Sequence, residues 1–126
     1  MIWLAVGLGG GIGAVARHAV NGVVTLRFGG GFPVGIFVVN TAGCLAIGLL
    51  AGLAAAGRLP VAEVGRTFLI AGLLGGFTTF SSFGLDTFTL LRGGQPALAF
   101  GNAAGQVVVG LFAVWLGFSA GSWVAR

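Results

Sequence analysis

Charged side chains are scarce in this sequence of 126 residues, where they make up only 6% of the composition. A soluble domain carries about 25% charged residues. There is no lysine, and the only acidic residues are Glu63 and Asp86. Hydrophobic residues account for 57%, and the mean hydropathy is +1.10. A domain this small cannot bury so many apolar side chains internally, so the composition excludes a soluble globular protein and indicates a membrane protein.

Residues that usually perform catalysis or bind metals are equally few. His18 and Cys44 are the only residues of their kinds, so no intrachain disulfide can form. The two carboxylates lie far apart in the sequence, and His, Cys, Asp and Glu do not cluster as they do in metal sites. The net charge of +4 comes from arginines scattered along the chain rather than grouped on one face. We therefore predict neither an enzyme nor a nucleic-acid-binding protein.

Four apolar segments are long enough to cross a bilayer, which takes about 20 residues as a helix. They cover approximately residues 2–26, 33–56, 64–91 and 96–124. The connecting segments contain glycine and arginine, and Pro33, Pro60 and Pro96 stand at or just before new helix starts, where the missing N–H costs little. The sequence therefore predicts an all-α integral membrane protein, a single four-helix domain of residues 1–126 with both termini on one side.

The arginines near the ends of these segments give little preference for one orientation in the membrane. Arg58, Arg66 and Arg126 fall on the side of the termini, and Arg27 and Arg92 fall on the other. Orientation follows the excess of Lys and Arg in short loops, and three against two is nearly balanced. We therefore predict that the chain inserts in both orientations, which would allow an antiparallel homodimer.

Glycine is abundant, with 26 residues, and much of it recurs at a spacing of four. Small residues at this spacing let helix backbones approach closely in lipid. The pairs are Gly7 and Gly11, Gly9 and Gly13, Gly48 and Gly52, Gly101 and Gly105, and Gly117 and Gly121. Two interpretations stay open. Either the glycines pack the helices of one bundle together, or several glycine faces serve an oligomer.

The third segment predicts an interrupted helix. Its centre, residues 75–84, has the sequence GGFTTFSSFG. Glycine costs about 1 kcal/mol relative to alanine in a helix, and Ser and Thr side chains compete for backbone partners, so we expect a break near Gly75 to Thr79. Broken helices inside a membrane line cavities or lie buried in protein, and in transporters they bind ions. The alternative is a kinked helix whose hydroxyls bond to the preceding turn.

Phe80 and Phe83 follow the predicted break at a spacing of three, so both face the same way on a helix. Such a pair ordinarily packs in a core. The edge of an aromatic ring is positive, however, so two rings facing a cavity could attract a small anion. Nearby Thr and Ser hydroxyls and the Asn40 amide can donate hydrogen bonds to it. Because there is no lysine, these weak donors would bind an anion and still release it.

Three motifs, taken in order, resemble those of the Fluc/CrcB fluoride channels. GGGIGAVAR at residues 9–17 resembles their first-helix motif, VNTAGC at 39–44 their second, and GGFTTFSSF at 75–83 their third. The resemblance covers the whole chain in length, number of spans and order of motifs. It implies a dual-topology antiparallel homodimer, with two pores at its interface, in the plasma (inner) membrane of a prokaryote. It also implies passive, selective export of fluoride and a structural Na⁺ ion at the dimer centre.

The resemblance further implies which residues carry the function. Gly75 and Thr78 would offer backbone carbonyls to the Na⁺ ion. The fourth segment departs from the family pattern of a tyrosine and serines, and its polar residues Asn102 and Gln106 share one helix face. The partners implied are fluoride, a second copy of the chain and membrane lipid. The expected fluoride-pore residues are Phe80, Phe83, Asn40, Thr79, Ser81, Ser82, Arg17, Asn102 and Gln106.

Two other functions fit parts of the pattern. Small multidrug resistance-type transporters also have four short helices and can form antiparallel dimers. They need a carboxylate deep in the first helix, however, and here the only charge in that segment before its end is Arg17. A structural subunit held by its glycine faces would explain the helix packing. It would not explain the hydroxyl-rich segment beside Phe80 and Phe83.

Overall fold

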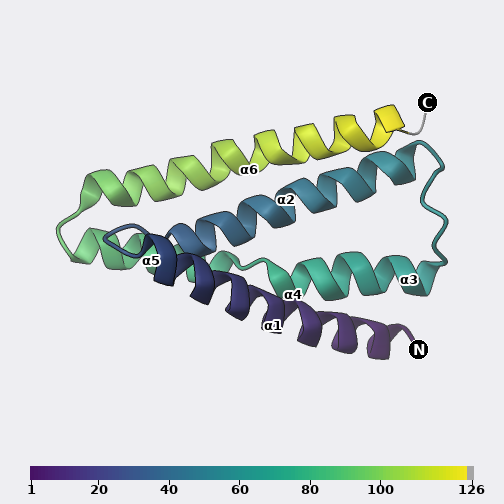
Figure 1. The fold of residues 1–126 in the computed structure, drawn as a ribbon, viewed down its shortest axis with the longest axis horizontal. Coiled ribbons are helices and arrows are strands. Elements are labelled where there is room, and N and C mark those ends of the chain that lie inside the picture. Colours follow the sequence, from purple (N-terminus) through teal and green to yellow (C-terminus); the bar gives the residue numbers. More distant parts are fainter. Residues whose placement is uncertain (125–126) are drawn as a thin grey trace.

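The computed structural model describes residues 1–124, which form helices joined by loops, with no strand in that range (Figure 1). The helices are α1 (Ile2–Phe28), α2 (Val34–Ala55), α3 (Glu63–Thr67), η1 (Phe68–Leu74), α4 (Gly75–Phe77), α5 (Phe80–Arg92) and α6 (Pro96–Val124). Helices α3, η1 and α4 run on from one another and, together with α5, make up one membrane span. Arg126, counted above on the side of the termini, lies outside the described residues.

Four helical spans are long and apolar enough to cross a membrane, as the sequence predicts. They contain 27, 22, 30 and 29 residues in chain order. The predicted boundaries agree with the observed ones to within about two residues; the first span, for example, ends at Phe28 rather than Leu26. The start of α1 and the end of α6 lie at the same end of the bundle (Figure 1), which confirms that the two termini share one side.

Helices α2 and α6 lie side by side along their length and form the most extensive helix pair in the chain (Figure 1). The approach is close because glycines on each helix face the backbone of the other. Gly48 of α2 lies against the carbonyl of Val114, and Gly117 of α6 lies against the backbone of α2. Gly52 and Gly121 repeat the arrangement one turn further on. A Cβ atom at any of these glycines would overlap backbone atoms that a packed helix cannot move aside.

Helix α1 packs in the same way against the first half of the third span. Gly9 and Gly13 lie against the backbone of η1 and α4, so this second seam is also built on glycine. Both seams favour the interpretation that glycines pack the helices of one bundle. By contrast, a Cβ atom at Gly7, Gly11 or Gly101 would have no heavy-atom neighbour within 4 Å, so these glycines face outward.

The third span breaks at Thr78 and Thr79, inside the range that the sequence predicts (Figure 1). Both residues are extended, with φ and ψ of −83° and 159° at Thr78 and −154° and 118° at Thr79. Ahead of the break, the seven residues of η1 form a π-helix, which the sequence did not predict. Such turns are rare and frequently occur at functional sites, so the distortion of this span begins well before the break itself.

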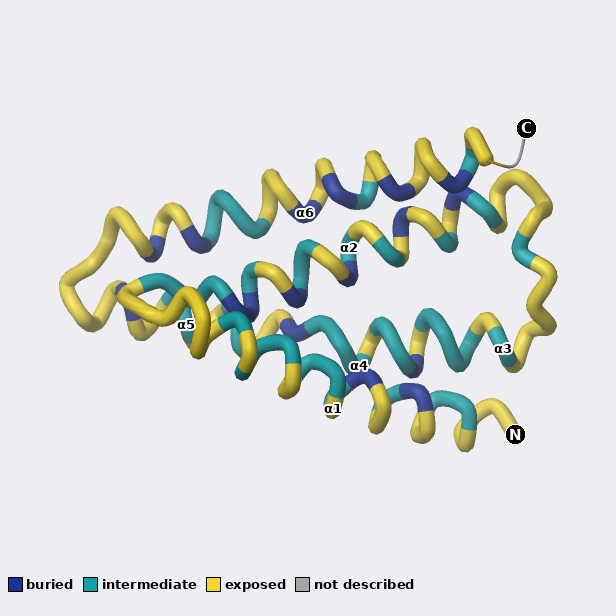
Figure 2. Tube along the Cα trace, in the orientation of Figure 1, coloured by how far each residue is buried: buried dark blue, intermediate teal, exposed yellow. Residues whose placement is uncertain are grey.

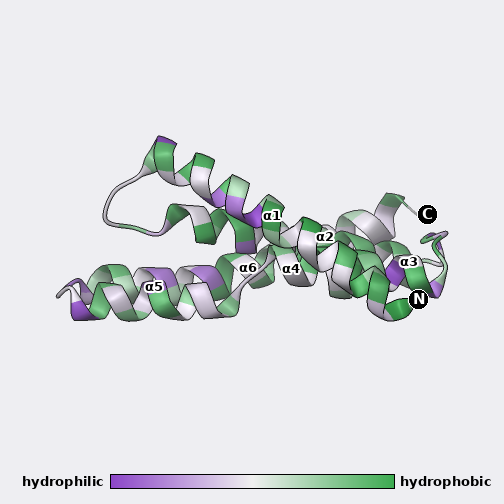
Figure 3. Ribbon diagram, turned by 90° about the horizontal axis from the view of Figure 1, so that it is seen from below, coloured by the Kyte–Doolittle hydropathy of each residue, from purple (hydrophilic) through white to green (hydrophobic). Residues whose placement is uncertain are grey.

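Few side chains are buried within the chain, and those that are buried lie mainly along the seams between helices (Figure 2). Val39 and Asn102 are the largest that are fully buried. Most large apolar side chains are exposed instead. Figure 3 shows hydrophobic residues over much of each long helix, with hydrophilic residues in the loops and on parts of α1 and α5. Such a surface needs lipid or another protein to cover it.

The glycine seam between α2 and α6 can be tested with alanine. Gly48→Ala places a methyl group against the Val114 carbonyl, and we expect the overlap to lower the free energy of unfolding by about 2 kcal/mol. The control is Gly22→Ala on α1, which meets open space and should be neutral or stabilising, because alanine favours a helix over glycine by about 1 kcal/mol. Thermal unfolding in detergent measures both variants. Equal midpoints would contradict the close packing.

Candidate functional site

Asn40 of α2 pairs with the backbone at the break. Its Oδ1 atom accepts a hydrogen bond of 2.9 Å from the Thr79 N–H. Its Nδ2 atom donates a hydrogen bond of 3.1 Å to the Thr79 carbonyl oxygen. The side-chain amide thus supplies one donor and one acceptor, as a neighbouring strand would. Because an unpaired backbone group in hydrocarbon costs several kcal/mol, this pairing makes the break tolerable.

Thr79 also starts the helix that follows the break. Its hydroxyl oxygen accepts a hydrogen bond of 3.2 Å from the Ser82 N–H, which is the usual arrangement at a helix N-cap. The hydroxyl oxygens of Ser81 and Ser82 each lie 3.2 Å from that of Thr79. The hydroxyl-rich turn therefore fixes where α5 begins, and with it the position of Phe80, the first residue of that helix.

The backbone carbonyls of Gly75 and Thr78 are among those that the break releases from their usual partners. In a regular helix the Gly75 carbonyl would accept from the Thr79 N–H, which here bonds a side chain of α2 instead. The Thr78 carbonyl would accept from the Ser82 N–H, which here bonds the N-cap hydroxyl. Arg17 of α1 approaches the Thr78 carbonyl, with Nη1 at 3.3 Å from the oxygen. The carbonyls expected to hold Na⁺ are therefore two that lose their helical donors at the break.

A chain of hydrogen bonds continues from Asn40 across α6 to α5. Asn40 Nδ2 donates to Gln106 Oε1 at 2.7 Å, and Gln106 Nε2 donates to Asn102 Oδ1 at 3.0 Å. Asn102 Nδ2 donates to Thr87 Oγ1 at 2.8 Å, and the Thr87 hydroxyl donates to the Phe83 carbonyl oxygen at 2.8 Å. Asn102 and Gln106 thus share one face of α6, as their spacing predicts. Thr87 was not among the predicted site residues. A polar side chain inside a membrane span is a candidate functional residue, so its hydroxyl could have identified it.

An open groove of about 400 Å³ lies beside the break, between α2, the third span and α6. Phe80 and Phe83 form part of its wall, with ring centroids 5.3 Å apart and planes inclined by 47°. Phe80 is 83% exposed. The rest of the wall is largely apolar. Of the predicted site residues, the groove brings together Asn40, Gly75, Thr78, Thr79, Phe80, Phe83 and Gln106.

The other four predicted residues lie around the groove rather than in its wall. Ser81 and Ser82 bond the N-cap hydroxyl at the start of α5. Arg17 reaches the break from α1. Asn102 is fully buried, at 0% exposed, and hydrogen-bonds to the side chain of Gln106. These four residues therefore support the groove through the residues that line it.

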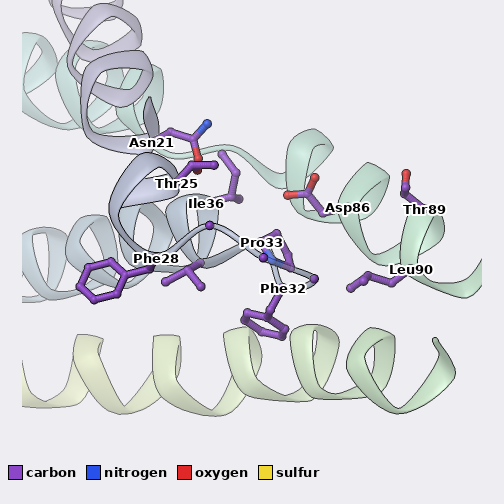
Figure 4. A pocket seen from close by; sticks show the side chains of 13 residues that line it. Asn21, Thr25, Phe28, Phe32, Pro33, Ile36, Asp86, Thr89 and Leu90 are labelled. Atoms are coloured by element: carbon purple, nitrogen blue, oxygen red, sulfur yellow. The ribbon is translucent and has the colours of Figure 1, made fainter. Parts of the chain in front are cut away.

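A second cavity, of about 310 Å³, lies between α1, the loop that follows it and α5 (Figure 4). Asp86 and Thr89 line it from α5, and Asn21 and Thr25 line it from α1. The Asp86 Oδ2 atom is buried and has no hydrogen-bond partner within residues 1–124. No lining residue is shared with the groove, so Asp86 belongs to a separate part of the protein from the phenylalanine pair.

Known proteins resemble this chain over nearly all of its length. Residues 4–118 match the family described as CrcB-like protein, Camphor Resistance (CrcB). A "Fluoride-specific ion channel FluC" of Opitutus terrae is 49% identical over 117 residues, which cover 92% of this chain and 89% of that protein. Proteins of the same name from Chloroflexus aurantiacus and Paracoccus denitrificans are 47% and 49% identical, each over 120 residues. These matches cover 95% and 94% of this chain and 94% and 93% of the two relatives.

The matches confirm the resemblance that the three sequence motifs carry. The relatives are named as ion channels rather than as enzymes, in agreement with the prediction of a non-enzyme. These relatives come from bacteria, and this chain has four helices that are long and apolar enough to cross a membrane. The chain is a multi-pass membrane protein of prokaryotic type.

The pairing at the break can be tested with Asn40→Leu. Leucine keeps a similar volume but leaves the N–H and the carbonyl of Thr79 without their partner on α2, so we expect a loss of about 3 kcal/mol in the free energy of unfolding. A lower thermal unfolding midpoint in detergent would show it. Cys44→Ala, one turn further along α2 and in the same groove wall, is the matched control and should shift the midpoint much less. A midpoint for Asn40→Leu as high as that of the control would contradict the pairing.

Proposed function

This chain belongs to the family of CrcB-like proteins, and on that premise we propose that it forms a fluoride-selective ion channel. It would export fluoride passively from the cytoplasm of a prokaryote across the plasma (inner) membrane. The observation that carries the proposal is the groove at the helix break, where a phenylalanine pair lies beside an amide side chain. The names of the relatives supply the identity of the ion.

The groove has the chemistry that suits a small anion. Phe80 and Phe83 are tilted relative to each other, so ring edges, which are positive, can face the groove. Gln106 adds an amide to the same wall. Arg17 does not line the groove; it is directed at the Thr78 carbonyl. Neutral donors and ring edges would hold fluoride firmly enough to replace part of its water shell, and weakly enough to release it.

We propose further that two copies pair in an antiparallel arrangement, with two pores at their interface. Three observations support this. The groove is open along one side, and Phe80 at its edge is 83% exposed. Gly7, Gly11 and Gly101 leave outward faces on which another helix could approach closely. The near balance of arginines lets copies insert in both orientations. Lipid would cover the remaining apolar surface.

We also propose that a Na⁺ ion joins the two copies at the dimer centre. The residues present fit this ion, because the carbonyls of Gly75 and Thr78 lose their helical donors at the break. Carbonyl oxygens at unwound helix segments coordinate Na⁺ in transporters. The Thr78 carbonyl keeps a second lone pair beside its bond with Arg17. A second copy would bring the same two oxygens to the dimer centre, and the ion would hold the two breaks together.

The proposed function predicts fast fluoride efflux from liposomes that contain the purified protein, because the groove offers a path for a small anion. A fluoride electrode measures the efflux, and a chloride electrode measures the comparison ion, which we expect to leave at the rate of protein-free liposomes. Correctly inserted protein that releases no fluoride would contradict the channel. Equal release of both ions would contradict its selectivity.

The phenylalanine pair should be required for this flux. Phe80→Ile and Phe83→Ile keep most of the apolar volume but remove the positive ring edge, so we expect each to lower fluoride efflux by at least about tenfold while the protein stays folded. Phe88→Ile changes an exposed phenylalanine of the same helix that does not line the groove, and it should conduct as the wild type does. Normal flux through both groove variants would rule out these rings as pore-lining groups.

A further inference from the structure

The orientation of every amide in the hydrogen-bond chain is dictated by the break. A backbone N–H can only donate and a carbonyl can only accept, so Asn40 must turn Oδ1 toward the Thr79 N–H and Nδ2 toward the Thr79 carbonyl. Asn40 therefore directs its Nδ2 donor at Gln106, and Gln106 must accept through Oε1. This leaves Nε2 of Gln106 to face Asn102, which must accept through Oδ1.

The far end of the chain agrees with the same direction. Asn102 turns Nδ2 toward the Thr87 oxygen, and the Thr87 hydroxyl donates onward to the Phe83 carbonyl, which cannot donate back. The chain therefore starts at a group that is only a donor and ends at a group that is only an acceptor. Reversing Asn40 or Gln106 would set oxygen against oxygen on one side and N–H against N–H on the other. Reversing Asn102 would set its N–H against that of Gln106, so the chain holds its amides in one orientation.

Counting hydrogens shows which amide can still serve a ligand. Asn40 has two N–H hydrogens on Nδ2, and it uses one on the Thr79 carbonyl and the other on Gln106. It has none left for an ion in the groove. Gln106 uses one N–H on Asn102, and the structure of residues 1–124 shows no partner for the second. Gln106 lines the groove, whereas Asn102 is 0% exposed.

We propose that Gln106 is the amide that donates a hydrogen bond to the transported anion, and that Asn102 and Thr87 are positioning residues that hold its N–H toward the groove. The inference rests on the proposed function, and it assigns Asn40 a purely structural part. An amide offers either an oxygen or an N–H, and only the N–H attracts an anion. By fixing the orientation of Gln106, the chain gives this wall of the groove a donor.

Side-chain amide spectra of ¹⁵N-labelled protein in detergent test the assignment directly. The sequence contains only five Asn and Gln residues, so the signals can be assigned by single substitutions. On titration with sodium fluoride, we expect one Nε2 proton of Gln106 to shift and both Nδ2 protons of Asn40 to stay nearly constant. Sodium chloride is the control titration and should shift neither residue. A shift at Asn40 without one at Gln106 would overturn the inference.

Flux through a matched pair of variants tests the positioning role. Thr87→Ser keeps a hydroxyl that can accept from Asn102 and donate to Phe83, whereas Thr87→Val keeps the shape without the hydroxyl. We expect Thr87→Val to reduce fluoride efflux about fivefold, the scale of one lost hydrogen bond, and Thr87→Ser to restore it. Thr87 does not line the groove, so a loss that serine rescues is transmitted through the chain.

The two hypotheses fail in different ways. If wild-type protein passes fluoride but Gln106→Met and Thr87→Val also pass it at the wild-type rate, the channel stands and the assignment of Gln106 is wrong. If wild-type protein passes no fluoride and no amide signal responds to it, the channel itself is wrong and the inference falls with it. Wild-type flux together with flux loss in Gln106→Met and a fluoride-dependent Gln106 shift supports both.

Discussion

The side-chain amide of Asn40 occupies the place of a missing strand or helical turn at Thr79, and the rest of the site depends on this pairing. It permits two extended residues in the middle of a membrane span, where no water can bond the freed N–H and carbonyl. Once Thr79 is extended, its hydroxyl is placed to cap α5, and the cap sets where Phe80 and Phe83 stand. The same conformation removes the helical donors of two carbonyls ahead of α5. The phenylalanine pair, the carbonyls and the groove thus share one cause.

The next link in the chain, from Asn40 to Gln106, forms because α2 and α6 lie very close together. Short side chains such as asparagine and glutamine reach across an interface when glycine lets the backbones approach, and α2 and α6 are joined by glycine on both sides. The 2.7 Å bond between Asn40 and Gln106 connects these same two helices, several turns from Gly48 and Gly117. The abundance of glycine and the polar chain, which look unrelated in the sequence, are therefore two parts of one arrangement. Wider spacing would leave each amide to find its own partner in hydrocarbon.

The sequence predicts the spans, the shared side of the termini and the break, because each follows from local properties: apolar length, punctuation by Gly, Arg and Pro, and the poor helix propensity of residues 75–84. It does not predict the π-helix of η1, which no local preference encodes. It also identifies Asn40 and Gln106 as polar residues in spans without showing that they bond each other, because 66 residues separate them. Thr87 was missed for a related reason. Its role depends on Asn102 of another helix, and in α5 alone it resembles any threonine bonded to the preceding turn.

The groove is lined by a few neutral polar groups and by no charged side chain, and the hydrogen-bond chain explains how such a site can favour an anion. A cationic donor needs no orientation, since an ammonium or guanidinium attracts an anion from any side, but it is costly in a membrane and binds too firmly for rapid exit. A neutral amide avoids both costs, yet it is as able to repel an anion with its oxygen as to attract it with its N–H. Other groups must therefore fix the orientation of the amide. A single neighbouring side chain cannot fix it, because that side chain could turn as well. A chain that begins at a backbone N–H and carbonyl can, because the N–H can only donate and the carbonyl can only accept. Asn102 and Thr87, which do not line the groove, are thus part of the means by which a neutral site acquires a definite sign.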